Sequence, residues 1–381
     1  MTVVEGLYEP LAADFQDVSH DVYRRLRDEF PVYRSKQQGQ LVYTLSRFDD
    51  VLRAAHDPDT FSSDGTDPVE GLMPMIVFMD PPRHDELRAL VSRAFTPRRV
   101  AELEPRVREI TRGLIDDFAN RGAVDIVPSL AAPLPSLVIA KMIGVPDDYV
   151  ERFRSWSEQL IEFHDPADGS EHITNIYTLF VELLDARRRE RQDDLMSALL
   201  DAEIDGRRLS DEELLGFCFI LIVGGNDTTT SLIGNGVDLL ARHPQQRASL
   251  VRDPALLANA IEEMLRLEPP AQVLFRRTTR EVELHGVTIP AGAAVNLVWA
   301  AANLDEREFD DPERFDVSRK IDRHLAFGHG LHYCLGASLA RLEARVAFEE
   351  LLARIPEYDV VSAERHCSPW ARAFKTLHIR F

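Results

Sequence analysis

Phe327–Gly328–His329–Gly330–Leu331–His332–Tyr333–Cys334–Leu335–Gly336 is the stretch from which the rest of this chain is best understood. Its three glycines let the backbone turn sharply and approach a flat surface closely. Cys334 stands at the start of a helix predicted from about residue 335 to 355, where free N–H groups and the helix dipole stabilise a thiolate. A thiolate suits a metal ligand or a nucleophile. With His332 as its base, Cys334 would serve a Cys-His hydrolase, and a buried core cysteine beside a turn is the plain structural alternative.

The spacing within this stretch resembles the haem-binding loop of the cytochrome P450 family. The family pattern Phe-x-x-Gly-x-x-x-Cys-x-Gly is matched at Phe327, Gly330, Cys334 and Gly336. The resemblance implies a heme b cofactor whose iron is bound by Cys334, a ligand that donates electron density and favours O–O cleavage. It also implies that Phe327 packs against the porphyrin, and that glycines such as Gly328 and Gly336 let backbone N–H groups point at the sulfur.

A second motif, Gly224–Gly225–Asn226–Asp227–Thr228–Thr229–Thr230, interrupts an apolar helix predicted from Asp211 to about Arg242. Glycine costs about 1 kcal/mol relative to alanine in a helix, so a local widening or kink is the plain interpretation. The motif also resembles the family's [Ala/Gly]-Gly-x-[Asp/Glu]-Thr-[Thr/Ser]. That resemblance implies a groove for O2 over the iron, with Thr228 ordering oxygen and water and Asp227 relaying protons.

The pair Glu263-x-x-Arg266 places a carboxylate and a guanidinium on one face of a predicted helix, a pattern that is common on exposed helices. Its position between the central helix and the cysteine loop resembles the family's structural Glu-x-x-Arg pair. In the family a third residue completes this cluster, and Arg314 of Pro312–Glu313–Arg314–Phe315 is the predicted partner. All three are expected to serve structure.

The two propionates of a haem need cationic donors. The resemblance assigns this role to four residues: His84, Arg88, Arg276 and His332. The plain alternatives are that Arg88 and Arg276 are solvated surface charges and that His84 caps the helix after Pro81–Pro82. We expect His324 to be a hydrogen-bonding residue of the proximal scaffold, and we assign no chemistry to His329.

The resemblance places the substrate between the distal haem face and several variable segments, namely 72–78, 163–179, the central helix, the residues after the Glu-x-x-Arg helix and the C-terminal region. The predicted pocket residues are Met75, Ile76, Ile220, Val223, Gly224, Gln272, Leu274 and Phe374. Most are apolar, and methionines suit an adaptable pocket. A hydrophobic or amphipathic small molecule is expected: a terpenoid, steroid, fatty acyl, polyketide or aromatic compound. Gln272 is the candidate for orienting a polar substrate group.

Most of the chain has helical periodicity, with β-favouring residues around a turn at 37–40 and a second β region over 282–299. The fold class is therefore mainly α with a small β region. The resemblance implies the cytochrome P450 fold, with the haem between the long central helix and the C-terminal cysteine-loop helix. Neither a linker nor an internal repeat divides the sequence, so residues 1–381 are expected to form a single haem domain.

The net charge of −20 argues against a nucleic-acid partner. Three cysteines in unrelated contexts, Cys218, Cys334 and Cys367, indicate a reducing compartment, with Cys218 read as a buried small apolar residue. The N-terminal stretch lacks the pattern of a signal peptide, and the longest apolar run near the motifs, Phe217 to Val223, is far short of the roughly 20 residues that span a bilayer. We expect a cytoplasmic protein with no membrane partner.

No flavin or nicotinamide fingerprint and no iron–sulfur cysteine cluster is present, so the electrons are expected from a separate ferredoxin and ferredoxin reductase. Four arginines are candidates for a basic docking patch, although solvated helix charges are an equal alternative: Arg98, Arg99, Arg323 and Arg341.

The predicted activity is that of a haem-thiolate monooxygenase, which inserts one oxygen atom from O2 into a hydrophobic small molecule by hydroxylation or epoxidation. One alternative is a P450 that performs a non-insertion oxidation such as ring coupling. A haem sensor or carrier is a second alternative, against which Asp227–Thr228 argues. The Cys-His hydrolase is a third, and it predicts no haem.

Overall fold

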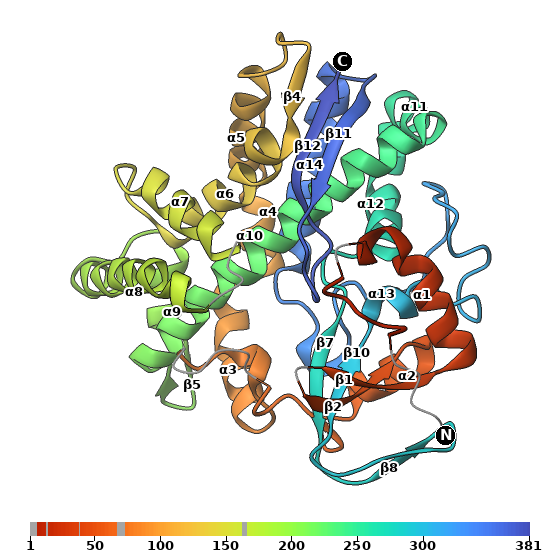
Figure 1. The fold of residues 1–381 in the computed structure, drawn as a ribbon. Coiled ribbons are helices and arrows are strands. Elements are labelled where there is room, and N and C mark those ends of the chain that lie inside the picture. Colours follow the sequence, from red (N-terminus) through yellow and green to blue (C-terminus); the bar gives the residue numbers. More distant parts are fainter. Residues whose placement is uncertain (1–5, 13, 38, 67–72, 162–165) are drawn as a thin grey trace. The chain divides into compact units, whose positions relative to one another are not determined.

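The computed structural model describes residues 6–12, 14–37, 39–66, 73–161 and 166–381, without the side chains of residues 94 and 157–170 (Figure 1). The chain divides into two compact units that interleave along the sequence. Unit 1 comprises Met1–Thr66, Gly234–Cys334 and Pro356–Leu377, and unit 2 comprises Asp67–Ile233, Leu335–Ile355 and His378–Phe381. The interpretation of residues 1–381 as a single haem domain stays a prediction.

Unit 1 is built on a mostly antiparallel five-stranded sheet. Its strands are, in spatial order, β1 (Val32–Gln37), β2 (Gln40–Leu45), β10 (Ala294–Leu297), β7 (Leu274–Thr278) and β3 (Phe61–Ser62). Neighbouring strands are antiparallel except β2 and β10, which are parallel. The register pairs Arg276 of β7 with Val295 of β10, which places this arginine in the interior of the sheet.

Helices and a second hairpin complete unit 1. They are α1 (Phe15–Glu29), α2 (Phe48–His56), α11 (Pro244–Arg252), α12 (Leu257–Leu267), α13 (Trp299–Ala302), the 3-10 turns η3 (Pro254–Leu256) and η4 (Gly330–His332), the hairpin of β8 (Val282–Leu284) and β9 (Val287–Ile289), and β11 (Asp359–Arg365). Side chains of the sheet, α2 and α13 form one buried apolar cluster around Phe48, Leu297 and Trp299. Leu325, just before the cysteine loop, belongs to the same cluster, so the loop starts from the core.

Unit 2 is almost entirely helical. Its elements are η1 (Ile76–Phe78), α3 (Arg83–Ala94), α4 (Pro97–Glu102), α5 (Glu104–Asp116), β4 (Ala123–Asp125), η2 (Val127–Ala131), α6 (Pro133–Ile143), α7 (Val150–Ile161), α8 (Pro166–Arg189), α9 (Leu195–Asp201), β5 (Glu203–Ile204), β6 (Arg207–Arg208) and α14 (Ala337–Arg354). The final residues of β12 (Phe374–Arg380) pair antiparallel with β4. Helix α14 is tied to α5 by ion pairs, among them Arg108 with Glu349 and Arg345 with Glu104.

The longest helix is α10 (Asp211–Arg242), drawn as one continuous ribbon in Figure 1. Its residues up to Ile233 belong to unit 2 and the remainder to unit 1. By length and composition α10 would span a bilayer, but 61% of its most apolar window is buried in the protein, as in the core helix of a soluble protein. The helix continues through Gly224 and Gly225, where a local widening or kink was predicted.

The mainly helical prediction is confirmed, and so are the hairpin of β1 and β2 and the second β region. The C-terminal helix α14 begins at Ala337, close to the predicted start at about residue 335. The strands β4, β7, β11 and β12 were not predicted. β4 pairs with β12 and β7 with β3, partners that lie far away in the sequence, so local periodicity carries little information about these two strands. β11 pairs with its neighbour β12.

Candidate active site

The cysteine loop of unit 1 is held in one conformation by its glycines. Gly328 and Gly330 have φ values of +65° and +68°, which strongly favour glycine. A Cβ at Gly330 would lie 2.6 Å from the carbonyl oxygen of Ala55, at the end of α2, so no larger residue fits there. The Cys334 amide donates to the Phe327 carbonyl at 2.9 Å, which closes the loop just before the cysteine. The sequence therefore builds a rigid turn that presents Cys334 two residues before Gly336, the N-cap of α14.

The Glu-x-x-Arg pair lies at the centre of a buried charge cluster. Glu263 and Arg266 are fully buried, and the Arg266 guanidinium donates to both Glu263 oxygens at 2.7 and 3.0 Å. The third member is Arg319, whose Nε donates to Glu263 Oε1 at 3.0 Å. The prediction of Arg314 was wrong: its side chain is 62% exposed and pairs with Asp316. The Arg314 carbonyl instead accepts a hydrogen bond from Arg319, so a backbone group of the predicted segment takes part.

Two hydrogen-bond paths lead from α12 to the cysteine loop. Arg266 donates to the Asn303 carbonyl at 2.9 Å, and the Asn303 side-chain oxygen accepts from the Leu325 amide at 2.7 Å. His324 Nδ1 accepts from the Ala326 amide at 3.1 Å, so Nε2 carries the proton and donates to Glu262 at 3.0 Å. His324 is therefore a hydrogen-bonding residue of this scaffold, as predicted. The scaffold holds the segment that leads into Phe327.

The predicted propionate donors are divided between the units. In unit 1, Arg276 is 5% exposed on β7, and His332 Nε2 lies 3.0 Å from the Ser63 hydroxyl. In unit 2, His84 is buried in the first turn of α3 with Nδ1 3.1 Å from Asp85, and Arg88 follows one turn later, partly buried. The burial of Arg276 argues against a solvated surface charge, because a buried guanidinium needs a compensating anion or acceptor.

Asp227 and Thr228 lie on α10 within unit 2. The Thr228 hydroxyl donates to the Gly224 carbonyl at 2.6 Å, and Ser231 donates in the same way to the Asp227 carbonyl at 2.8 Å. Burial raises the pKa of Asp227 to about 7. A carboxyl group with this pKa exchanges protons readily at neutral pH, which is the property that general acid–base catalysis requires.

One face of α10 remains open although most of the helix is buried. Ile220 is partly buried, while Val223, at 41% exposed, and Gly224 are exposed, and Thr228 is partly exposed one turn later. Residues spaced by three and four form one stripe of a helix. Met75 is buried and Ile76 partly buried in the segment that enters η1. Phe163 and Leu72, at the ends of two predicted substrate segments, lie outside the described residues.

The predicted pocket residues of unit 1 are engaged within the protein. Gln272 is 3% exposed, and its amide accepts from Tyr23 at 2.8 Å and donates to the Pro269 carbonyl at 2.5 Å. Phe374 is 5% exposed and stacks under the Arg365 guanidinium at 3.7 Å. Leu274 packs against the unit 1 core. The orienting role suggested for Gln272 therefore does not fit, because both ends of its amide already bond to the protein.

The two remaining cysteines lie apart from this chemistry. Cys218 is completely buried, which raises the pKa of its thiol to about 12, as expected for an inert core residue. Cys367 is exposed and donates to the Leu11 carbonyl. Among the described residues, no group of three or more His, Cys, Asp and Glu side chains is arranged to hold a metal ion.

Sequence reasoning missed Ser63, Asn303 and Arg319, which contact His332, the cysteine loop and Glu263. None of the three stands in a motif. Arg319 had one available signal, since it follows the predicted segment 312–315 by only a few residues.

Comparison with known proteins gives a consistent result. The cytochrome P450 family pattern matches residues 149–253 and 248–355. The chain is 43% identical over 342 residues to erythromycin C-12 hydroxylase of Saccharopolyspora erythraea, covering 86% of this chain and 85% of that protein. It is 40% identical over 360 residues to vitamin D(3) 25-hydroxylase of Pseudonocardia autotrophica, covering 92% and 89%. Among solved structures, cytochrome P450 CYP109Q5 from Chondromyces apiculatus is similar with a TM-score of 0.93, 40% identity and 97% coverage of both chains.

Proposed function

Since the chain belongs to the cytochrome P450 family and is a haem-containing monooxygenase, we propose that Cys334 is the thiolate ligand of its haem and that Asp227 and Thr228 handle the protons of the reaction. The haem, when bound, supplies the iron at which O2 is bound and activated. The observation that carries this proposal is the loop in which the Cys334 amide bonds to Phe327 and Gly330 lies against Ala55. This loop fixes the direction of the cysteine backbone.

Each polar residue has a defined task in this proposal. Arg276 and His332 of unit 1 and His84 and Arg88 of unit 2 neutralise the propionates by charge-assisted hydrogen bonds. Ser63 orients the His332 ring through its 3.0 Å contact. Asp227 takes a proton from solvent and passes it on, since its pKa of about 7 leaves both protonation states populated at neutral pH. Thr228 can turn its hydroxyl from the Gly224 carbonyl toward ordered water.

The test is the absorption spectrum of the purified protein, reduced with dithionite and exposed to carbon monoxide. A Soret band shifted strongly to the red is expected in wild type and should be lost in Cys334→Ala. Circular dichroism of the variant checks that it still folds. A variant that keeps the shifted band would show that another residue ligates the iron.

The proposed substrate is a hydrophobic small molecule that is hydroxylated. The open stripe of α10 offers Ile220, Val223 and Gly224, which form an apolar surface leading to Thr228. Two relatives are named for hydroxylating erythromycin and vitamin D3, so compounds of these kinds are the first to test. Incubation with a redox system under labelled O2 should place one labelled oxygen atom in the product. Product without label would indicate a non-insertion oxidation.

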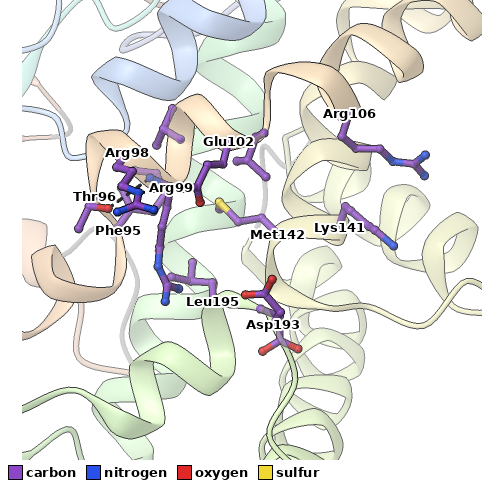
Figure 2. Close-up of a pocket in the computed structure, with 13 residues that line it drawn as sticks. Phe95, Thr96, Arg98, Arg99, Glu102, Arg106, Lys141, Met142, Asp193 and Leu195 are labelled. Atoms are coloured by element: carbon purple, nitrogen blue, oxygen red, sulfur yellow. Dashed lines mark hydrogen bonds and ion pairs between the residues drawn. The ribbon is translucent and has the colours of Figure 1, made fainter.

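The proposed electron donor is an acidic ferredoxin, reduced by its own reductase. A hollow in unit 2 is lined by the cationic residues Arg98, Arg99, Arg106 and Lys141 and by the acidic residues Glu102, Asp193 and Asp194. Figure 2 shows Arg98 and Arg99 on one side, Arg106 and Lys141 on the other, and Met142 between them. Arg98 is paired with Glu102 and Arg106 with Glu109, whereas Arg99 and Lys141 have no ion pair with a described residue. Arg323 contributes little to a basic patch, because Glu308 accepts two hydrogen bonds from it.

Charge reversal tests the donor site. Arg99→Glu with Lys141→Glu should lower the ferredoxin-driven rate about tenfold at low salt and leave dithionite reduction unchanged. Arg252→Glu, at an exposed arginine on α11, is the control. An unchanged ferredoxin-driven rate in the double variant would remove this hollow from the docking surface.

The proposed location is the cytoplasm, without membrane attachment. The acidic composition and three cysteines, of which none forms a disulfide, fit a reducing compartment. Cell fractionation with detection of the haem protein in the soluble fraction tests this, and recovery in the membrane pellet would oppose it.

A further inference from the structure

At Gly216 the helix α10 meets another segment of unit 2 in close backbone contact. A Cβ there would lie 2.1 Å from the carbonyl oxygen of Pro74 and 3.0 Å from its carbon. Real Cβ atoms do not approach backbone so closely, so only glycine permits this contact. Glycine costs about 1 kcal/mol relative to alanine inside a helix. The close approach to Pro74 gives a physical reason for a glycine at this position.

A second contact fixes the same segment one turn further along α10. The Met73 amide donates to the Tyr177 hydroxyl at 3.3 Å, and the Tyr177 ring stacks on Phe219 with centroids 5.1 Å apart and planes at 23°. Phe219 is itself buried. The segment 73–78 is thus held to α10 directly at Gly216 and indirectly through α8. Hydrogen bonds from Phe78 to Met75 and from Met79 to Ile76 make its continuation rigid.

Gly216 lies on the same face of α10 as the open stripe. Gly216, Ile220, Gly224 and Thr228 follow one another at intervals of four residues, so they form one row along the helix. Gly216 is buried under Pro74, whereas the following members of the row are partly or fully exposed. At about 1.5 Å per residue, the Pro74 contact lies roughly 18 Å along the helix axis from Thr228. The segment 73–78 therefore covers one end of the row, and Thr228 lies toward the other.

We infer that Gly216 is a specificity-determining residue: by admitting Pro74 against α10, it positions Met75 and Ile76 and sets the length of substrate that the open stripe accepts. This rests on the proposed function, in which the stripe faces the substrate. Gly216 touches no reacting atom and acts through Pro74. The substrate class that fits is an elongated apolar molecule no longer than the stripe, such as a compact ring system, whereas a longer extended chain meets the segment 73–78.

The first measurement uses 1-alkylimidazoles of increasing chain length, whose nitrogen binds haem iron whatever the natural substrate is. Affinity follows from the shift of the Soret band in the full-length holoenzyme. Each added methylene should strengthen binding roughly fourfold until the alkyl chain reaches the segment 73–78. Beyond that length the affinity should stay constant. In Gly216→Ala the segment 73–78 should be displaced, so the affinity should stop rising only at a longer alkyl chain. Gly113→Ala is the matched control, because Gly113 is an exposed helical glycine of α5 with nothing within 4 Å of its Cβ position.

The second measurement, amide hydrogen exchange, does not depend on the haem or on any ligand. Gly216→Ala should raise exchange of the amides of Met73 and residues 75–79 at least tenfold, and Gly113→Ala should not. Tyr177→Phe keeps the ring on Phe219 and removes only the bond to Met73, so it should produce the same changes in smaller measure. It also serves as the test variant if Gly216→Ala does not fold.

The outcomes separate the two proposals. A Gly216→Ala protein that matches Gly113→Ala in both measurements overturns the inference. Faster exchange, with no change in the alkyl chain length at which the affinity stops rising, leaves Gly216 as a structural contact and overturns its role in specificity. Absence of a thiolate-type carbon monoxide spectrum in wild type would instead defeat the proposed function, and the exchange result would still report on the contact.

Discussion

Gly330 lies so close to Ala55 that a Cβ on the glycine would come within 2.6 Å of the alanine carbonyl oxygen. The end of α2 and the cysteine loop therefore touch backbone to backbone. The loop owes its position to this contact as well as to its own turns, since Gly330 also has a φ of +68°. The cysteine is placed by packing within unit 1.

Gly330→Ala should therefore lower the free energy of unfolding by more than backbone strain alone would. We compare it with Gly292→Ala, which has a φ of +78° and nothing within 4 Å of its Cβ position. Both variants should lose about 1 kcal/mol or more of the free energy of unfolding because alanine disfavours a positive φ. Gly330→Ala should lose roughly 1–3 kcal/mol more through overpacking. Urea denaturation measures the difference, and the haem content of the purified variants should fall in parallel. Equal losses in the two variants would mean that the loop yields without cost.

The charge cluster distinguishes Arg319 from Arg314. Arg319→Ala leaves Glu263 buried with one partner fewer, and it should lower the free energy of unfolding by about 3–5 kcal/mol. Arg314→Ala removes an exposed pair with Asp316 and should cost no more than about 1 kcal/mol. Thermal or urea unfolding of both variants decides the matter. A larger loss in Arg314→Ala would restore the sequence-based assignment of the third partner.

Asp227→Asn should slow turnover and remove one pH dependence of the turnover rate. Burial raises the pKa of Asp227 to about 7, so the wild-type rate should bend near pH 7, where the group changes protonation state. The amide cannot relay protons, so turnover should fall roughly 100-fold or more and lose this bend. Steady-state turnover from pH 5.5 to 8.5 provides the measurement, with an unchanged carbon monoxide spectrum as the control for an intact haem site. A bend that persists in the variant would assign the titration to another group.

Glu343 of α14 should make stability fall as pH rises. It is fully buried, its Oε2 has no hydrogen-bond partner among the described residues, and burial raises its pKa to about 8. The unfolded chain ionises from about pH 4.5 while the folded chain stays neutral, so stability is lost between these values. Glu343→Gln should have a larger free energy of unfolding than wild type across this range, by roughly 2–4 kcal/mol at pH 8.

Glu350, on the same helix, is the control, because its pKa is shifted in the opposite direction. Burial acts to raise its pKa, but hydrogen bonds from Arg112, Arg354 and Arg108 outweigh this effect and hold it at about 2. Its contribution is present above about pH 4.5 and is lost as pH falls toward 2, so Glu350→Gln should destabilise the neutral protein. Melting temperatures from pH 5 to 9 test both variants. A pH-independent difference for Glu343→Gln would show that Glu343 is ionised in the folded protein.

Local patterns were informative where the chemistry itself is local. The glycines around Cys334, the β-favouring residues around the turn at 37–40 and the apolar run of α10 are short-range features, so their predictions needed no knowledge of packing. The role suggested for Gln272 depended on what surrounds the residue, and Tyr23 and Pro269 already occupy its amide. The same limit explains why Ser63 and Asn303 were missed.

The sequence by itself determined the class of this protein, because Cys334 with its glycines and Asp227–Thr228 with theirs are each encoded within about ten residues. Tertiary structure alone decided that Arg319 rather than Arg314 completes the cluster around Glu263, that Gly216 admits Pro74, and that Asp227 titrates near neutrality. The physical reason is that close approach and desolvation are properties of segments brought together in space. The sequence specifies which residues can donate or accept hydrogen bonds. Packing in the folded protein decides which of these residues come into contact and how completely water is excluded from them.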